Sequence, residues 1–398
     1  MSSSSAATPQ SPTGSPQRSP LTPTSPERVS PALAAATALA LRSVPSLRTR
    51  AAHKGGHGKV LIVGGSANYS GAPFYAAISA LKVGCDLAWI MCSRSAASAI
   101  KAYSPEPIVM PSLPEGNTFG SADADADAVR IAVAEFIALA SRVDAVVVGP
   151  GLGRDALALR AAAEIVAACR ARRLPVVLDG DGLFMLSQRP DLLSVPPLGE
   201  DGPVFDEPKL ETVVVTPNAA EFARLWGATA PAGELLPSSD GIEAALLLAQ
   251  RLGPGVVVLR KGRVDAVAAA AGTPSAGLLI DEAGSPRRCG GQGDVLAGAV
   301  GTFLAWAANA GFLSPRRDRQ KVAEFAITPS GAVVGQLPSQ LLQPQPLQAE
   351  VVLAATAAAA RVTRIAAALA FASKRRSMTT PDLIASLGDA FEAALPSA

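Results

Sequence analysis

The chain has 398 residues, of which 49% are hydrophobic, 17% charged and 4% aromatic, so it can bury the core of one large domain or two ordinary ones. Its 35 basic and 33 acidic residues leave a net charge of +2, which provides no bulk charge for binding nucleic acid or an anionic membrane. The four cysteines form no CxxC pair and there are only two histidines, which argues against a zinc site and against a disulfide framework. We expect a soluble intracellular protein without nucleic-acid or membrane partners.

The first 31 residues differ from the rest, because 20 of them are Ser, Thr or Pro and bulky apolar side chains are almost absent. Such a segment cannot bury enough apolar surface to offset the entropy cost of ordering. The sequence therefore predicts a disordered tail over residues 1–38 and one folded domain over residues 39–398. Arginines outnumber acids near this end, as in a mitochondrial transit peptide, but the prolines oppose the amphipathic helix that such a peptide needs. We expect a cytoplasmic protein, with mitochondrial import as the alternative.

After this tail, short apolar runs alternate with stretches of helical spacing. Strands are predicted at residues 59–63, 86–91, 144–148, 175–179, 213–216 and 255–260. Helices are predicted at residues 72–83, 155–172, 219–226, 241–252, 294–308 and 351–372. This alternation predicts an α/β fold with a mainly parallel sheet and helices on both of its faces. Ligands of such sheets bind at the carboxyl ends of the strands, so a site is expected in the loops that follow the strands.

Two stretches need separate interpretation. The long apolar stretch at residues 351–372 contains Arg361 and Arg364, so we interpret it as a buried helix rather than a membrane span. The run of alternating Ala and Asp within residues 121–128 is interpreted as a solvated loop that leads into a helix.

The most informative segment for function is residues 284–298, GSPRRCGGQGDVLAG. Three glycines directly precede an apolar helix, so backbone N–H groups and the positive end of the helix dipole can converge on an anion. Arg287 and Arg288 add charged donors for phosphate. Asp294 stands where the helix begins, and a carboxylate there can accept the proton of a hydroxyl that attacks a phosphoryl group. The alternative is that Asp294 only caps the helix.

Two common nucleotide-binding motifs are missing from the sequence. No GxxxxGK[ST] occurs, so there is no Walker P-loop. The segment GGSANYSG at residues 64–71 follows the first strand but does not fit GxGxxG, and no acidic residue ends the next strand. A Rossmann dehydrogenase is therefore disfavoured.

Eight motifs follow one another along the chain. They are KGGHGK (54–59), GGSANYSGAPFYAA (64–77), KAYSPE (101–106), GPGLGRD (149–155), LDGDGL (178–183), TPNAAEFARL (216–225), KG (261–262) and RRCGGQGD (287–294). Together they resemble the ATP-dependent NAD(P)H-hydrate dehydratases of eukaryotes, which are members of the ribokinase-like superfamily. The resemblance runs from about Leu41 to Ile384, and RRCGGQGD is its most specific part.

This resemblance implies a ribokinase-like three-layer α/β/α sandwich with a mainly parallel central sheet, acting as a nucleotide repair enzyme of the hydro-lyase class. Such an enzyme uses ATP and Mg²⁺ to dehydrate the (S)-form of C6-hydrated NADH or NADPH. The hydroxyl is phosphorylated and phosphate then leaves, so the products are NADH or NADPH, ADP and phosphate. No epimerase domain precedes the dehydratase portion, so we expect a separate NAD(P)H-hydrate epimerase as the pathway partner. The sequence leaves a monomer and a homo-oligomer both open.

The resemblance also implies which residues form the site, with Asp294 as the catalytic base. The implied hydrate-binding residues are Gly151, Gly153, Asn218, Ala219, Ala220, Glu221, Phe222, Ala223, Arg224 and Asp294. The implied ATP-binding residues are Lys261, Gly262, Arg263, Val264, Asp265, Gly284, Ser285, Pro286, Arg287, Arg288, Cys289, Gly290, Gly291, Gln292 and Gly293. Asp179 and Asp181 could hold Mg²⁺ through water, but Asp is also common in loops after strands, so the metal ligands stay unassigned.

Several of these residues have a second interpretation. Asn218 either caps the helix that it begins or faces a ligand, and Glu221 is either a first-turn acid or a ligand. Lys261 either binds the nucleotide or is solvated. A further group is expected to pack or to be incidental rather than to act in the site: Tyr69, Phe74, Tyr75, His53, His57 and Cys289. Residues 314–350 look longer and more irregular than the corresponding part of the family.

Two other functions compete with the dehydratase. A ribokinase-like vitamin or sugar kinase would phosphorylate a small alcohol and stop there, using the same glycine loop. A catalytically dead nucleotide-binding regulator would recruit partners through the Ser/Pro-rich tail. GPGLGRD, NAAEFAR and RRCGGQGD together favour the dehydratase over the kinase, and the intact Asp294 and glycine loop disfavour the regulator.

Overall fold

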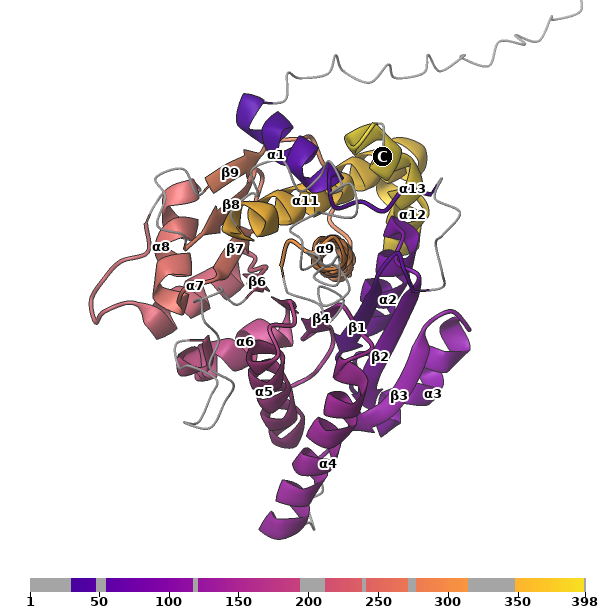
Figure 1. The fold of residues 1–398 in the computed structure, drawn as a ribbon, viewed down its shortest axis with the longest axis vertical. Coiled ribbons are helices and arrows are strands. Elements are labelled where there is room, and N and C mark those ends of the chain that lie inside the picture. Colours follow the sequence, from indigo (N-terminus) through magenta and orange to yellow (C-terminus); the bar gives the residue numbers. More distant parts are fainter. Residues whose placement is uncertain are drawn as a thin grey trace, which may run out of the picture.

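The computed structural model describes residues 30–47, 55–116, 121–193, 212–237, 241–270, 277–313 and 348–396. These residues form a nine-stranded sheet with the order β3-β2-β1-β4-β5-β6-β7-β8-β9 (Figure 1). The first seven strands pair in parallel, and the last two add an antiparallel edge. The strands are β1 (Lys59–Val63), β2 (Leu87–Ser93), β3 (Ile108–Leu113), β4 (Ala145–Val148), β5 (Val176–Leu178), β6 (Val213–Val215), β7 (Val256–Arg260), β8 (Asp265–Ala269) and β9 (Gly277–Ile280).

Helices cover both faces of this sheet (Figure 1). On one side lie α1 (Pro31–Leu41), α2 (Gly71–Val83), α3 (Arg94–Tyr103), α9 (Gln292–Asn309), α11 (Gln348–Lys374), α12 (Thr380–Ala385) and α13 (Leu387–Ala394). On the other lie α4 (Ala122–Ala140), α5 (Ala156–Ala171), α6 (Asp181–Gln188), α7 (Ala219–Thr229) and α8 (Ile242–Leu252). Strand β1 explains the unbroken apolar runs, because Val60 and Ile62 enter the first core while Leu61 and Val63 enter the second. The three-layer prediction is confirmed.

The predicted elements are all present, with their ends shifted by three residues at most. Three strands at the edges of the sheet, β3, β8 and β9, were not predicted. Of these, β8 and β9 pair antiparallel instead of alternating with helices. The N-terminal boundary was also wrong. Residues 31–38 belong to α1, where Ser30 caps the helix and Leu33 is only 1% exposed, so the folded part begins before residue 39. Residues 1–29 and 314–347 lie outside the described residues. Of the stretch 314–350 that was expected to be irregular, residues 348–350 belong to α11.

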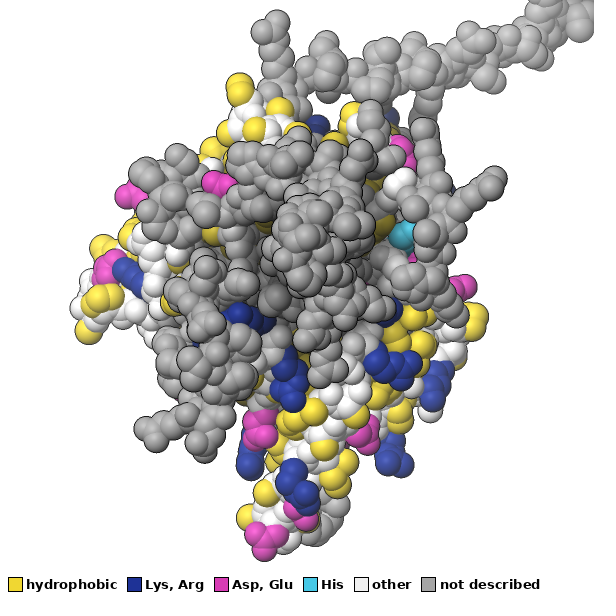
Figure 2. Space-filling view, in the orientation of Figure 1, with side chains coloured by type: hydrophobic (Ala, Val, Ile, Leu, Met, Phe, Trp, Pro, Cys, Tyr) yellow, Lys and Arg dark blue, Asp and Glu magenta, His cyan; other side chains and the backbone are white. Residues whose placement is uncertain are grey.

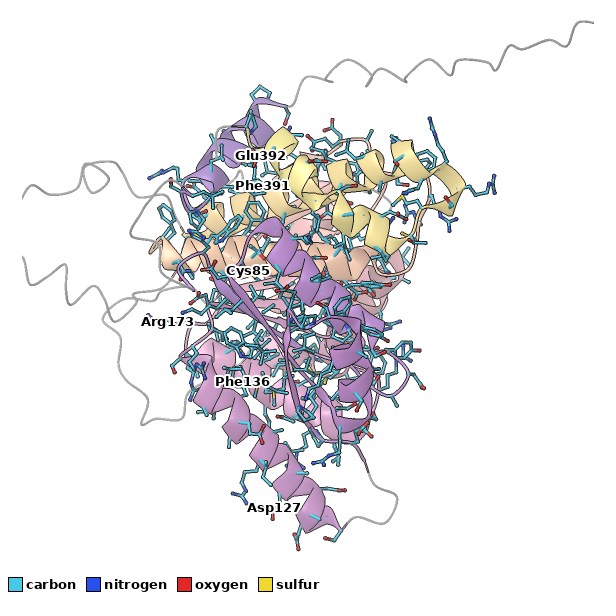
Figure 3. The ribbon with its side chains drawn as sticks, turned by 90° about the vertical axis from the view of Figure 1, so that its right-hand side faces the viewer. Cys85, Asp127, Phe136, Arg173, Phe391 and Glu392 are labelled. Carbon is cyan, nitrogen blue, oxygen red and sulfur yellow. The ribbon has the colours of Figure 1, made fainter. Side chains whose placement is uncertain are left out.

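The interpretation of residues 121–128 as a loop is contradicted as well, because α4 already begins at Ala122. Ser121 accepts a hydrogen bond from the backbone N–H of Ala124, and Asp123 and Asp125 in the first turn complement the helix dipole. Phe136 points from α4 into the core, whereas Asp127 lies near the N-terminal end of the helix (Figure 3). Acidic and basic side chains are interspersed around this helix (Figure 2).

Helix α11 tests the interpretation of the long apolar stretch. Within the described residues, one helix, Gln348–Ser377, is long and apolar enough to cross a membrane. However, 78% of its most apolar window is buried inside the molecule, where α11 packs against α9. The helix is therefore a core helix, as predicted.

Gly298 sets the position of α9 against α2. A Cβ at this residue would lie 2.1 Å from the carbonyl oxygen of Ala76, so only glycine allows the two helices to come this close. The close packing fixes the start of α9, which carries the glycine turn, at the edge of the sheet where the parallel strands end.

Candidate active site

The carboxyl ends of three neighbouring strands bring the central charged residues together. Asp179 follows β5, Thr216 follows β6 and Lys261 follows β7, and these strands pair side by side in parallel. The sequence predicted a site in these loops, and the topology places them at one edge of the sheet.

Lys261 lies at the centre of this group. Its Nζ is 2.7 Å from Oδ1 of Asp179 and 3.8 Å from Oε2 of Glu221. Burial would lower the pKa of Lys261, but the two carboxylates outweigh it and raise the pKa above its ordinary value. Lys261 is therefore a largely buried ammonium held by two carboxylates, and not a solvated side chain.

Asp294 lies in the first turn of α9, beside this ion pair. Gly291, with a φ of 96°, is the N-cap, so Asp294 is two residues inside the helix and does not cap it. Burial, and then the negative charge of Asp179, raise the pKa of Asp294 to about 7, against the opposing effect of Lys261. A carboxyl with this pKa changes its protonation near neutrality, which suits a group that takes up a proton during catalysis.

The backbone of the turn before Asp294 also lies beside the Lys261–Asp179 ion pair. The first N–H groups of a helix have no partner inside the helix, so the start of α9 offers donors to an anion. Gly293 lies so close to the ion pair that a Cβ there would be 3.3 Å from Nζ of Lys261 and 3.6 Å from Oδ2 of Asp179. A phosphoryl group at this turn would therefore meet helix donors, an ammonium and Asp294 together.

Two cavities meet at Asn218. The nucleotide cavity, of about 990 Å³, is lined by most of the expected ATP-binding residues, which are Lys261, Gly262, Arg263, Val264, Asp265, Gly284, Ser285, Pro286, Arg288, Cys289, Gln292 and Gly293. The second cavity, of about 940 Å³, is lined by the expected hydrate-binding residues Gly151, Gly153, Asn218, Ala220, Glu221 and Arg224. Asn218 lines both cavities.

Some expected residues line neither cavity. Asp294 is one of them, although it lies beside Lys261, which lines the nucleotide cavity. Phe222 is fully buried and stacks on Trp226, because it occupies the core face of α7. Ala219 and Ala223 are exposed on the same helix but do not line the described cavity. The side chain of Arg287 turns away from the nucleotide cavity, and its Nε donates to the carbonyl oxygen of Met378 at 2.8 Å. Gly290 and Gly291 shape the turn without lining the cavity.

The two interpretations of Asn218 and Glu221 are compatible with each other. Oδ1 of Asn218 accepts from the backbone N–H groups of Ala220 and Glu221, and Oε2 of Glu221 accepts from the backbone N–H of Asn218 at 2.8 Å. This capping box fixes both side chains at the start of α7, where they also face the second cavity. Burial raises the pKa of Glu221, although Lys261 opposes the effect.

The remaining residues follow the expectation in part. Tyr69 is 57% exposed and lines the second cavity, so its assignment to the core was wrong, whereas Phe74 and Tyr75 pack against the core. Cys289 is half-buried and accepts hydrogen bonds from Gln292 and Thr380. His57 lies by Asp86, away from both cavities, and His53 is outside the described residues.

Arg364 on α11 is a nucleotide-cavity residue that the motifs missed. It pairs with Asp265 at 3.1 Å and donates to the carbonyl oxygens of Glu282 and Arg263 at 2.6 and 2.5 Å. It therefore connects both loops of the cavity to a core helix. The signal in the sequence was an arginine within an apolar helix, which was used only to exclude a membrane span.

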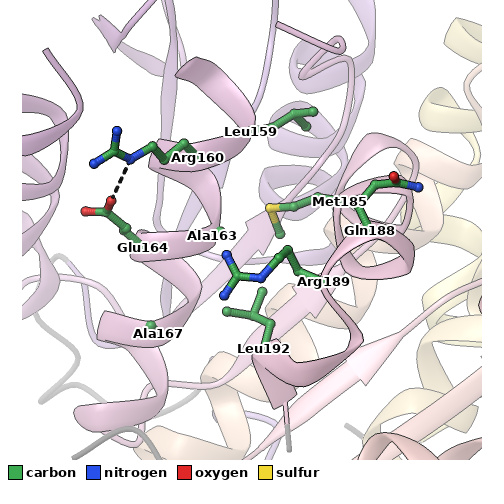
Figure 4. Close-up of a pocket in the computed structure, with 9 residues that line it drawn as sticks. All are labelled: Leu159, Arg160, Ala163, Glu164, Ala167, Met185, Gln188, Arg189 and Leu192. Atoms are coloured by element: carbon green, nitrogen blue, oxygen red, sulfur yellow. Dashed lines mark hydrogen bonds and ion pairs between the residues drawn. The ribbon is translucent and has the colours of Figure 1, made fainter. Parts of the chain in front are cut away.

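A third cavity, of about 410 Å³, lies between α5 and α6 and is lined largely by apolar side chains (Figure 4). Arg160 at its rim pairs with Glu164 on the same helix at 3.3 Å. None of the expected site residues lines it.

Comparisons with known proteins identify the family of this chain. The sequence model of the NAD(P)H-hydrate dehydratase family matches residues 60–388. Proteins named ATP-dependent (S)-NAD(P)H-hydrate dehydratase from Vitis vinifera and Rattus norvegicus are each 37% identical to this chain. The match covers 89% of the chain and 87% of the first relative, and 87% of the chain and 82% of the second.

Solved structures share the fold at lower identity. A ribokinase-like protein from Enterococcus faecalis has a TM-score of 0.57 at 18% identity, covering 90% of this chain and 95% of that one. An ADP/ATP-dependent NAD(P)H-hydrate dehydratase from Bacillus subtilis, co-crystallised with ATP and Mg²⁺, has a TM-score of 0.52 at 18% identity, covering 89% and 96%. With the extent of the family match and the identity to its curated members, this chain belongs to the NAD(P)H-hydrate dehydratase family.

Proposed function

We propose that this protein is an ATP-dependent (S)-NAD(P)H-hydrate dehydratase, which returns C6-hydrated NADH and NADPH to their active forms. The observation that carries the proposal is the charged group around Lys261. Lys261 lines the nucleotide cavity, its partner Glu221 lines the second cavity, and Asp179 and Asp294 lie beside it. Relatives that match most of the chain bear this name. Small nucleotides are thus its substrates, and one cavity is available for each.

The geometry supports a phosphorylation followed by an elimination. ATP in the nucleotide cavity would direct its terminal phosphoryl group to the start of α9, while the hydrate approaches from the second cavity past Asn218. Asp294 takes the proton of the C6 hydroxyl as the hydroxyl oxygen bonds to phosphorus and the bond to ADP breaks. Lys261 and the helix N–H groups stabilise the charge of the transferring group. Phosphate then leaves C6 and a proton leaves the neighbouring ring carbon, which restores the double bond.

Mg²⁺ fits this site through the nucleotide rather than through a protein cage. Among the described residues, no group of three or more His, Cys, Asp or Glu side chains is placed to hold a metal ion. Mg²⁺ commonly binds through phosphates, waters and one or two carboxylates. Asp179 is the carboxylate beside the phosphoryl position that would hold it here, and the ion would neutralise phosphate charge.

Two biological expectations belong to the same proposal. The protein acts on the (S)-hydrate, so a separate epimerase would convert the (R)-hydrate for it. We propose the cytoplasm as the compartment of the reaction, with the mitochondrion as the alternative.

The direct test follows absorbance at 340 nm while purified protein meets (S)-NADH hydrate, ATP and Mg²⁺. An ATP-dependent rise is expected, with no rise when ATP is omitted or when the (R)-hydrate replaces the (S)-form. A flat trace from folded protein that binds ATP would contradict the proposal, and small alcohols would then be screened as kinase substrates.

A further inference from the structure

The second cavity has two arginines on its wall that share one aromatic ring. The guanidinium carbon of Arg154 lies 4.3 Å from the ring centroid of Phe184, and that of Arg224 lies 5.7 Å from the same centroid. The three residues come from the loop after β4, from α6 and from α7, and all three line the cavity. The fold thus brings two cations from distant parts of the sequence to one place.

These two cations are poorly neutralised within the protein. Nε of Arg154 is 3.8 Å from Oδ1 of Asp181, too long for a hydrogen bond, and its side chain is 62% exposed. Arg224 is exposed and forms no ion pair with any residue that the structure describes. Their guanidinium N–H groups are therefore open to a ligand in the cavity.

The carboxylates that line the same cavity are already engaged. Each accepts a hydrogen bond from a backbone N–H group: Glu115 from Ser95, Asp155 from Gly116, Asp181 from Gly153 and Glu221 from Asn218. They hold loops and helix starts in place. Two like charges over one ring repel each other, and an anion between them would remove that repulsion while the ring faces keep the guanidinium groups oriented.

We propose that Arg154 and Arg224 bind a phosphate group of the hydrated dinucleotide, with Phe184 orienting both guanidinium groups. This inference rests on the proposed function, because it assumes that the hydrate enters the second cavity. Guanidinium groups donate several hydrogen bonds in a planar arrangement that matches phosphate oxygens. The pyrophosphate is present in both substrates, and the 2′-phosphate is present only in the NADPH form.

The length of α7 favours the pyrophosphate over the 2′-phosphate as the group that the two arginines bind. Asn218 at its start adjoins the reacting end of the cavity, and Arg224 stands six residues further, a helical rise of about 9 Å. In the substrate, one ribose separates the nicotinamide ring from the nearer phosphate. A hydrated ring beside Asp294 would therefore place its pyrophosphate near the two arginines.

The test uses the full chain and steady-state kinetics with (S)-NADH hydrate and (S)-NADPH hydrate. Arg154→Ala and Arg224→Ala should each raise the KM for the hydrate about 10-fold, the effect expected from losing one charged hydrogen bond, with kcat nearly unchanged. Arg160→Ala is the matched control, because Arg160 is an exposed arginine that lines the third cavity and pairs with Glu164. Phe184→Leu should give a smaller rise in KM than either arginine variant.

The pattern across substrates identifies the phosphate. An equal loss on both hydrates supports pyrophosphate binding, and a loss confined to the NADPH hydrate supports 2′-phosphate binding. Unchanged KM values for both hydrates, with an active wild type, would overturn the inference and leave the proposed function intact. If the wild type did not turn over the hydrate, the proposed function would fail, and fluorescence titration with NADPH would still decide whether the arginine variants bind it more weakly.

Discussion

Lys261 and Asp179 form a largely buried ion pair, with 2.7 Å between Nζ and Oδ1, and Thr216 donates to the same oxygen at 2.7 Å. The pair joins the carboxyl ends of β5 and β7 across β6. Its ammonium also lowers the pKa of Asp294, which burial and Asp179 raise. The pair therefore has two roles. It holds the ends of two strands together, and its ammonium keeps the pKa of Asp294 close to neutral pH.

The first prediction concerns the pH dependence of catalysis. Because the pKa of Asp294 is about 7 and the reaction needs its carboxylate form, kcat/KM should rise with pH to about 7 and then level off. Asp294→Asn should lose about 100-fold or more in kcat, the usual contribution of a general base, together with this acidic limb. The measurement is a pH–rate profile of both proteins between pH 5 and 9. If the acidic limb persists in the variant, a group other than Asp294 causes it.

The same substitution should stabilise the fold above neutral pH. The pKa of Asp294 is raised from 3.8 to about 7 on folding, so the native state binds the proton more tightly than the unfolded state. The stability that this proton binding contributes is fully present below pH 4 and is lost as the pH rises through 7. Asp294→Asn should therefore gain up to about 4 kcal/mol at pH 8 and little at pH 4, which urea unfolding at both pH values can measure. An equal effect at the two pH values would contradict this account.

Lys261→Met should shift the acidic limb as well as reduce the rate. Without the ammonium, Asp294 faces Asp179 and Glu221 alone, so its pKa should rise and the limb should move to higher pH. Lys101→Met, at an exposed position on α3, is the matched control and should leave the profile unchanged. A limb that stays in place in Lys261→Met would mean that Lys261 does not set the pKa of Asp294.

Gly293→Ala tests how closely the turn approaches the ion pair. The added methyl group would lie 3.3 Å from Nζ of Lys261 and so crowd the place where a phosphoryl group would bind. We expect at least about a 10-fold loss of kcat/KM, since displacements of about 1 Å in a reacting geometry can cost even more. Gly227→Ala on α7 has open space around it and should keep full activity, with an equal or higher melting temperature. Full activity of Gly293→Ala would contradict a phosphoryl site at this turn.

Arg364 should act on ATP binding through the loops that it holds. Arg364→Ala removes the ion pair to Asp265 and two hydrogen bonds to loop carbonyls, so the KM for ATP should rise about 10-fold or more. Arg364→Lys should restore part of the effect, because it keeps the charge but not the planar donor set. The KM for the hydrate should stay near the wild-type value in both variants, and a parallel rise in both KM values would indicate general loosening of the fold.

The sequence was most informative where a local residue pattern determined the local structure. The run KVLIV predicted β1 with its observed ends, because a strand buried on both faces needs unbroken apolar side chains. Residues 121–128 were misread because their spacing looked like a polar loop, whereas alanine propensity and the Ser121 cap make the segment helical. The turn before Asp294 could be predicted as an anion-binding turn because three glycines stand directly before an apolar helix.

The rest of the site depends on tertiary neighbours. Arg364 reaches the nucleotide loops from a helix that begins far along the chain, and no local spacing could show that contact. Phe222 lies within a motif that was expected to bind the hydrate, but it faces the core, since a helix turns successive side chains to different sides. The stacking of Arg154 and Arg224 on Phe184 likewise requires three elements to meet.

The most direct test of the account is the stoichiometry of one reaction, measured as ADP, phosphate and NADH formed from (S)-NADH hydrate and ATP. The account predicts equal amounts of all three from the wild type, and formation that is about 100-fold or more slower from Asp294→Asn, although that variant still binds ATP. ADP formed without matching phosphate and NADH would contradict the account, because it would identify an enzyme that phosphorylates the alcohol and stops there.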